Sequence, residues 1–260
     1  MSSLEYKVDL VYELTSKELK ARYKNSLLGY LWSLLNPLAL SLVFYVGLGV
    51  ILQAKVPPGE NYPYFLMLIC GLFPWQWLAN SVNAGANVYI GNANLIRKVA
   101  FPRELLPLAT VLNDLLHFVA CLPVIVLFLL LAGMRPSVQW IWGVPALMAA
   151  EFLIAYGLAL AVGSLNLFFR DLANLVSLLL QMLFYLTPIV YALDWIKQPL
   201  LRKLIFINPV TPLFACWHDL LLKGRFDGGY FGLSILYGLI ALVLGLAVHH
   251  RLKGKFAEMT

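Results

Sequence analysis

Apolar residues dominate six long stretches of the chain, and each is about the length of a membrane-spanning helix. The first stretch carries no charged residue between Lys24 and Lys55. A helix pairs its own backbone N–H and C=O groups, for which lipid offers no partner. The pattern therefore predicts six transmembrane helices, over residues 31–53, 62–85, 105–132, 138–165, 172–193 and 230–248.

A further apolar stretch, residues 204–217, is too short to span a membrane and contains Asn208, Pro209 and Pro212. We interpret it as a re-entrant or interfacial external segment between the fifth and sixth spans. A short helix is expected from about Thr211 to Leu222. The alternative, a seventh span, would place the two termini on opposite sides of the membrane.

Residues 1–25 show a different pattern, with polar and apolar positions at helical spacing. They are charged throughout and lack the apolar core of a signal peptide, so we expect them to be retained. The sequence predicts an amphipathic helix lying in the cytoplasmic interface. Its apolar side would carry Leu4, Val8, Val11, Leu14 and Leu19, and its polar side Asp9, Glu13, Lys17, Lys20 and Lys24.

Composition supports an all-α integral membrane protein. Hydrophobic residues make up 61% of the 260 residues, charged residues only 12%, and the mean hydropathy is +0.80. Soluble domains carry about 25% charged residues, so this chain has too few to cover a water-exposed surface. We expect one transmembrane domain over residues 1–260: an interfacial helix (1–25), a six-span bundle (26–250) and a cytoplasmic tail (251–260).

The net charge of +6 fits membrane topology better than nucleic-acid binding. With six spans, most of the lysines and arginines fall at the termini and in the loops on the same side as the termini. Cytoplasmic loops are enriched in these residues. The sequence thus predicts a multi-pass protein of the cell inner membrane with both termini in the cytoplasm.

Motifs for ATP or metal chemistry are missing from the sequence. Gly254-Lys255 has neither the upstream glycine nor the following hydroxyl of a phosphate loop. We therefore expect no catalytic residue, metal or cofactor in this chain. The ionisable residues inside the spans are Asp114, His117 and Glu151, which would either couple a carrier to an ion or simply form hydrogen bonds within the bundle.

The loop between the second and third predicted spans is short, basic and apolar. Asn94 precedes a turn of helix and Pro102 ends it before the third span. Such a helix suits docking into a groove on a soluble partner, with Leu95, Ile96 and Phe101 buried there and Arg97 and Arg103 at the rim. The alternative is an ordinary basic cytoplasmic loop.

Several segments resemble the permease subunits of ABC-type polysaccharide exporters, which export O-antigen, teichoic acid or capsule chains. They are residues 16–24, 28–37, 95–103, 166–171, 187–189 and 208–212. The resemblance covers nearly the whole chain. It implies a homodimer paired with two copies of a cytosolic ABC ATPase, which binds the ATP and Mg.

The resemblance also implies roles for particular residues. ATPase coupling would involve Asn94, Leu95, Ile96, Arg97, Lys98, Phe101, Pro102 and Arg103. The substrate would be a polysaccharide, O-antigen above all, on an undecaprenyl diphosphate carrier, and Arg22, Lys24 and Arg170 would meet the diphosphate at the cytoplasmic entrance. The alternatives are a drug or small-lipid efflux permease of the same superfamily, or an ion-coupled carrier.

A sugar chain has many hydroxyls and apolar C–H faces but few charges, so flat aromatic rings would contact it weakly and repeatedly. Aromatic residues make up 13% of the chain. Many of them would face lipid or the membrane interface. The expected glycan channel residues in the first, second and fifth spans are Tyr45, Tyr64, Trp75, Trp77, Tyr185 and Tyr191.

Overall fold

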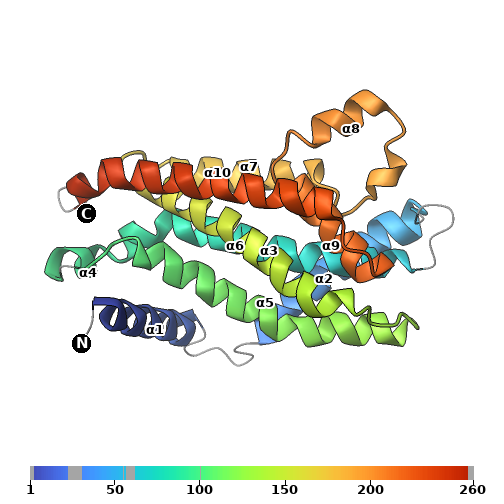
Figure 1. Cartoon of the computed structure of the whole chain (residues 1–260), viewed down its shortest axis with the longest axis horizontal. Coiled ribbons are helices and arrows are strands. Elements are labelled where there is room, and N and C mark those ends of the chain that lie inside the picture. The colour runs from blue at the N-terminus through green and yellow to red at the C-terminus, as the bar shows by residue number, and fades with distance from the viewer. Residues whose placement is uncertain (1–2, 23–30, 55, 57–61, 100, 257–260) are drawn as a thin grey trace.

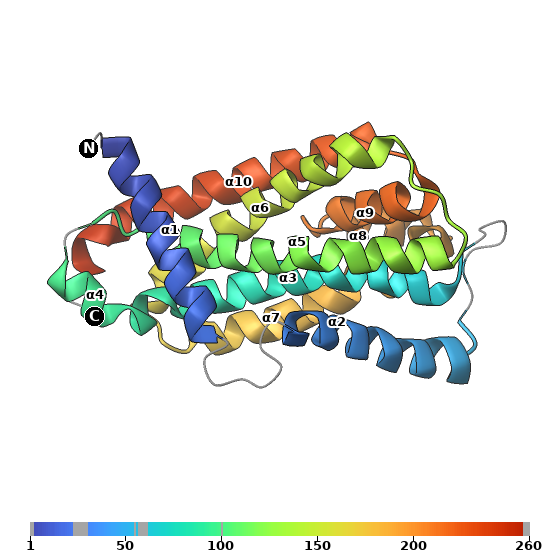
Figure 2. The same ribbon diagram turned by 90° about the horizontal axis from the view of Figure 1, so that it is seen from below.

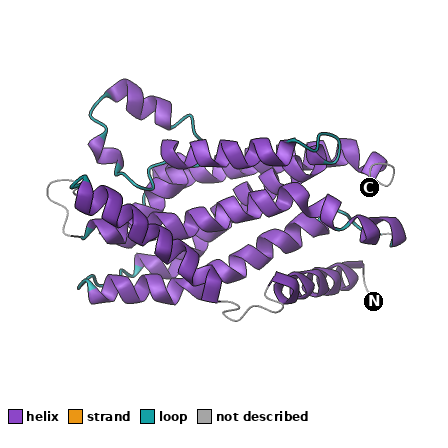
Figure 3. Cartoon of the chain, turned by 180° about the vertical axis from the view of Figure 1, so that it is seen from behind, coloured by secondary structure: helices purple, strands orange, loops and turns teal. Residues whose placement is uncertain are grey.

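The computed structural model describes residues 3–22, 31–54, 56, 62–99 and 101–256, which form an elongated bundle of helices (Figure 1). These residues contain no β-strand (Figure 3). The α-helices are α1 (Ser3–Arg22), α2 (Leu31–Phe44), α3 (Tyr64–Gly91), α4 (Ala93–Lys98), α5 (Leu105–Leu131), α6 (Gln139–Asn166), α7 (Leu172–Leu186), α8 (Pro199–Ile205), α9 (Thr211–Lys223) and α10 (Gly228–Leu252).

Within the described residues, five helical segments are long and apolar enough to cross a membrane. They match five of the six predicted spans as candidate membrane helices. The first joins α2 to a π-helical segment, Tyr45–Ile51, and the others correspond to α3, α5, α6 and α10.

The fifth predicted span, α7, is shorter than expected. It ends at Leu186 rather than at residue 193, and its 15 residues reach about 22 Å, less than the roughly 30 Å of a bilayer core. Helix α7 ends there because Pro188 disfavours helical backbone at Thr187, which is extended. A sixth membrane crossing at α7 therefore stays a prediction.

Helix α3 is the centre of the bundle. It packs against α2, α5, α6, α7 and α9 and is the most buried of the candidate spans. The N-terminus, the C-terminal end and α4 lie at one end of the bundle, which we call the α4 end. Helices α8 and α9 lie at the other end, the α9 end (Figure 1).

Glycines allow α6 to cross two neighbours with its backbone in direct contact. A Cβ atom on Gly245 of α10 would overlap the carbonyl group of Gly157 of α6. On the other side of α6, a Cβ on Gly163 would lie 2.5 Å from the carbonyl oxygen of Gly85 in α3. Small residues commonly occupy membrane helix contacts because they let backbones approach closely. These crossings fix the α3–α6–α10 core.

Helix α9 is buried against α3, α6 and α10, and its bounds confirm the short helix expected from Thr211. Trp217 Nε1 donates to Glu151 Oε2 on α6 at 2.8 Å. Trp140 Nε1 on α6 donates to the Leu220 carbonyl oxygen at 2.7 Å. These bonds hold α9 inside the bundle. That residues 204–217 form a re-entrant or interfacial segment of the membrane stays a prediction.

Helix α1 crosses the α4 end and packs on α5 (Figure 2). Leu14 is buried, and Thr110 Oγ1 on α5 donates to Glu18 Oε1 at 3.0 Å. Val8 is exposed, so the expected apolar side is only partly covered by the bundle. The structure confirms a helix in this region, whereas its position in the membrane interface stays a prediction.

Candidate functional site

A groove of about 570 Å³ opens between α2, α3 and α7. Its lining combines aromatic rings with amides and the hydroxyl groups of Ser177 and Tyr185. The aromatic members are Phe44, Trp75, Phe184 and Tyr185, and the polar members are Gln76, Asn83, Asn174, Ser177 and Gln181. Among the described residues that line the groove, none is charged. We call this feature the amide groove.

The amide groove presents neutral hydrogen-bonding groups beside the faces of aromatic rings. Ser177 Oγ donates to Asn83 Oδ1 at 2.8 Å, which joins α7 to α3 across the groove. Phe184 lies between two other rings, 5.7 Å from the Trp75 ring and 5.4 Å from the Phe44 ring. Amides both donate and accept, and rings contact apolar faces. The surface therefore suits a neutral molecule that has both hydroxyls and apolar faces.

The predicted aromatic channel residues divide into two groups. Trp75 and Tyr185 line the amide groove. Tyr45, which is partly exposed, and Tyr191, which is half-buried, lie outside the groove lining. Tyr64 and Trp77 are buried among other side chains of the chain.

The burial of Tyr64 and Trp77 has clear structural reasons. The Tyr64 hydroxyl donates to the Val190 carbonyl oxygen at 2.6 Å, and the Trp77 ring stacks on Phe118 at 5.1 Å. Both side chains thus hold helices and loops of the bundle together. In this conformation neither ring is open to a passing substrate.

The polar residues of the amide groove were missed by the sequence analysis, which searched for aromatic and charged side chains. A signal for them existed. Asn174, Ser177 and Gln181 are spaced by three and four positions in an otherwise apolar segment, which places them on one face of α7. Gln76 and Asn83 are seven positions apart, so they likewise lie on one face of α3.

The predicted coupling segment forms α4 and the turn after it, at the α4 end. Ile96 is buried, while Leu95 and Phe101 are half-buried against an apolar cluster that contains Leu14 and Val88. The apolar side of α4 thus packs on the chain itself. Its exposed surface consists of Asn94, Arg97, Lys98 and Val99.

Arg103 and Glu104, which follow α4, contact the C-terminal end of α10. Arg103 Nη1 donates to the Lys253 carbonyl oxygen at 2.7 Å, and its guanidinium lies 5.6 Å from the centre of the Phe256 ring. Glu104 Oε2 lies 3.6 Å from His249 Nε2. The half-buried Pro102 joins these contacts to α4. The segment that follows α4 is thus tied to the C-terminal end of α10.

The structure describes only some of the residues that were expected to form a cationic entrance. Arg170 is exposed in the turn between α6 and α7. That turn is held by Asn166, whose Nδ2 donates to the Ala86 carbonyl oxygen at 2.9 Å. The side chain of Arg22, the last residue of α1, and the whole of Lys24 lie outside the described residues.

The ionisable residues inside the spans lie in packed surroundings. Asp114 Oδ2 accepts a hydrogen bond from Ser81 Oγ at 3.2 Å, and Glu151 is held by Trp217. His117 is also buried. None of the three lines the amide groove. Asp114 and Glu151 thus form hydrogen bonds within the bundle. These contacts do not test the other alternative, coupling to an ion.

Comparison with known proteins identifies the family. Residues 9–221 match the ABC-2 type transporter family. The chain belongs to this family. The match runs from α1 into α9, and the relatives named below align over 83–99% of this chain.

The similar ABC-2 relatives are named as polysaccharide exporters. An O-antigen export system permease protein of Klebsiella pneumoniae is 40% identical over 99% of this chain and 97% of its own length. The O-antigen export permease of Myxococcus xanthus is 33% identical over 83% of this chain and 81% of its own. A polysialic acid transport protein of Escherichia coli is 22% identical over 95% of each.

Proposed function

We propose that this chain is the permease subunit of an ATP-driven exporter that moves a lipid-linked O-antigen polysaccharide out of the cytoplasm. The observation that carries the proposal is the 40% identity, over almost the full length, to an O-antigen export permease. The identity to the polysialic acid transport protein is much lower, which favours O-antigen over capsule as the substrate.

The amide groove is the proposed contact surface for the polysaccharide. Its amides would exchange hydrogen bonds with sugar hydroxyls, and Trp75 and Tyr185 would contact the C–H faces. The absence of charge among its described lining residues avoids strong binding that would trap a moving chain. Arg170, with Arg22 and Lys24, is proposed to meet the carrier diphosphate.

ATP hydrolysis is proposed to occur in two copies of a separate cytosolic ATPase, which would hold ATP and Mg. The exposed polar surface of α4, with Arg97 and Lys98, would contact the ATPase. The contacts of Arg103 and Glu104 with α10 would transmit the movement of α4 into the bundle.

A homodimer is proposed, with α2 and α7 facing the second copy. Both helices lie at the edge of the bundle, and the amide groove opens between them. Two copies related by a twofold axis would enclose a wider path than one. Exposed apolar residues on this side include Leu42, Val43, Leu178, Met182 and Leu186.

The proposed orientation puts both termini and the α4 end in the cytoplasm and the α9 end outside the inner membrane. The excess of lysine and arginine at the termini and in the loops of the α4 end supports it. In this arrangement α7 and the extended residues after it would complete the sixth crossing.

Filling the amide groove should block export without breaking the complex. The change is Ser177→Trp, because Ser177 is exposed and lies in the groove wall. We expect surface O-antigen to fall at least about tenfold in a strain that carries this variant, while the ATPase still co-purifies. The matched control is Leu179→Trp, on the same helix but outside the groove lining. Equal export by the two variants would exclude the groove as the path.

A further inference from the structure

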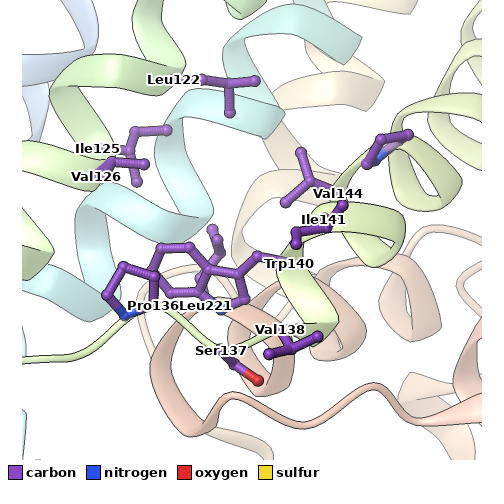
Figure 4. Close-up of a pocket in the computed structure, with 11 residues that line it drawn as sticks. Leu122, Ile125, Val126, Pro136, Ser137, Val138, Trp140, Ile141, Val144 and Leu221 are labelled. Carbon is purple, nitrogen blue, oxygen red and sulfur yellow. The ribbon is translucent and has the colours of Figure 1, made fainter.

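A second, apolar pocket lies at the α9 end, between the C-terminal part of α5 and the start of α6. Its volume is about 490 Å³. Figure 4 shows the aliphatic side chains of Leu122, Ile125, Val126 and Val144 around it, with the Trp140 ring across the pocket and the Ser137 hydroxyl at one edge. We call this feature the apolar slot.

A basic pocket of about 650 Å³ adjoins the apolar slot and shares Ser137 and Leu221 with it. Its lining includes Arg135, Lys223 and Arg225. An apolar cavity therefore lies next to one whose lining has three cationic side chains.

The wall between the two pockets is held by hydrogen bonds between separate loops. Ser137 Oγ donates to the Gly224 carbonyl oxygen at 3.1 Å. Gly224 has a φ of 64°, a left-handed conformation that favours glycine. Gln139 Oε1 accepts from the backbone N–H of Phe226. The loops before α6 and after α9 are thus fixed relative to each other without any ligand.

Among the residues that the structure describes, only one of the three cations of the basic pocket pairs with carboxylates. Lys223 Nζ lies 3.1 Å from Asp219 Oδ1 and 3.4 Å from Asp194 Oδ2. Arg135 and Arg225 are exposed, and neither has an ion pair with a carboxylate among the residues that the structure describes. These two arginines lie beside an apolar cavity at the end of a membrane bundle, so they suit the binding of an anion.

We propose that these two pockets bind one anionic phospholipid, with an acyl chain in the apolar slot and the phosphate between Arg135 and Arg225. An arginine guanidinium forms paired hydrogen bonds with phosphate oxygens. The side-by-side placement of the pockets matches a molecule with an anionic head and an apolar tail. This inference does not depend on the transported substrate, because it concerns the membrane lipid around the α9 end.

The test is lipid binding to the purified full chain in detergent, measured by native mass spectrometry. Phosphatidylglycerol and phosphatidylcholine with the same acyl chains are the probes. We expect wild-type protein to bind phosphatidylglycerol at least about tenfold more tightly. Both lipids carry a phosphate, but the cationic choline of phosphatidylcholine cancels its charge and is repelled by the arginines, whereas phosphatidylglycerol is a net anion. The double variant Arg135→Gln, Arg225→Gln should lose that preference.

Two further arms make the test specific. The double variant Lys197→Gln, Arg202→Gln removes two exposed cations from the same end but outside both pockets, and should keep the preference. Val126→Trp, which fills the apolar slot, should weaken phosphatidylglycerol binding, and excess inorganic phosphate should not displace the lipid.

Three results would overturn the proposal. The first is an equal affinity of wild-type protein for the two lipids. The second is an equal loss of preference in the two double variants. The third is displacement of phosphatidylglycerol by inorganic phosphate, which would mean that the basic pocket is a site for free phosphate rather than for a lipid.

Discussion

Gly245→Leu should abolish the folded bundle. A side chain at this position would overlap the carbonyl group of Gly157, so α10 and α6 would have to separate along their contact. Overpacking of a well-packed core costs about 1–3 kcal/mol when side chains can adjust, and here the obstacle is backbone. We expect no monodisperse protein after extraction in mild detergent, measured by size-exclusion chromatography.

Gly232→Leu is the matched control, on the same helix. Apart from the adjoining residues and the backbone of its own helix, no atom of the described residues lies within 4 Å of the position that a Cβ would take there. This variant should elute as wild-type protein does and unfold at the same temperature or slightly above it. Equal behaviour of the two variants would show that the α6–α10 crossing is not as close as described.

Reversal of two charges on α4 should uncouple the transporter from its ATPase. Arg97→Glu combined with Lys98→Glu changes only exposed side chains of the proposed docking surface. Rim charges govern association rate and salt dependence, so we expect ATPase binding to weaken about tenfold or more at low salt. Co-purification over a range of salt concentrations measures this effect.

Two controls separate docking from folding. Arg202→Glu combined with Lys203→Glu makes the same change on α8, at the opposite end, and should leave ATPase binding intact. Ile96→Ala removes a side chain that is buried in the permease, so it should cost about 2–5 kcal/mol of permease stability instead. A docking role for α4 would be refuted by wild-type co-purification of the double charge reversal.

Most of the fold could be predicted because lipid imposes a simple rule on the chain. Spans must be long, apolar and helical, and the structure places α5, α6 and α10 within a few residues of the expected bounds. Helix α3 begins near its expected start and continues past its expected end to Gly91. The predicted length of α7 was wrong because the apolar stretch continues past Leu186, whereas Pro188 ends the helix. Hydropathy alone measures apolar length, not backbone continuity.

Which helices pack against each other could not be predicted from the same hydropathy pattern. Ala241 and Gly245 are spaced four apart in α10, and Ala159 and Gly163 in α6, which is typical of close membrane helix contacts. Which helix each pair contacts depends on the tertiary arrangement.

The candidate site was predicted less well than the fold. Aromatic content directed attention to Tyr64 and Trp77, which are buried, because ring count does not distinguish a core from a path. The amide groove depends on residues from α2, α3 and α7 that meet only after folding.

The predicted coupling segment shows the same limitation. Its position after α3 was predictable from charge and from Pro102. The apolar side of α4 was expected to face a partner, but Ile96 is already covered by the chain. Only the tertiary structure could show which face of this short helix is left exposed.

Transport in a reconstituted system tests the central claim most directly. Proteoliposomes would contain this chain and its cognate ABC ATPase, oriented so that the ATPase lies on the outer face of the vesicle. Lipid-linked O-antigen polysaccharide would be supplied outside. We predict ATP-dependent accumulation of polysaccharide in the lumen with both proteins present. Neither protein alone should transport, and this chain alone should hydrolyse no ATP. Accumulation driven by an ion gradient without the ATPase, or none with ATP and both proteins, would contradict the account.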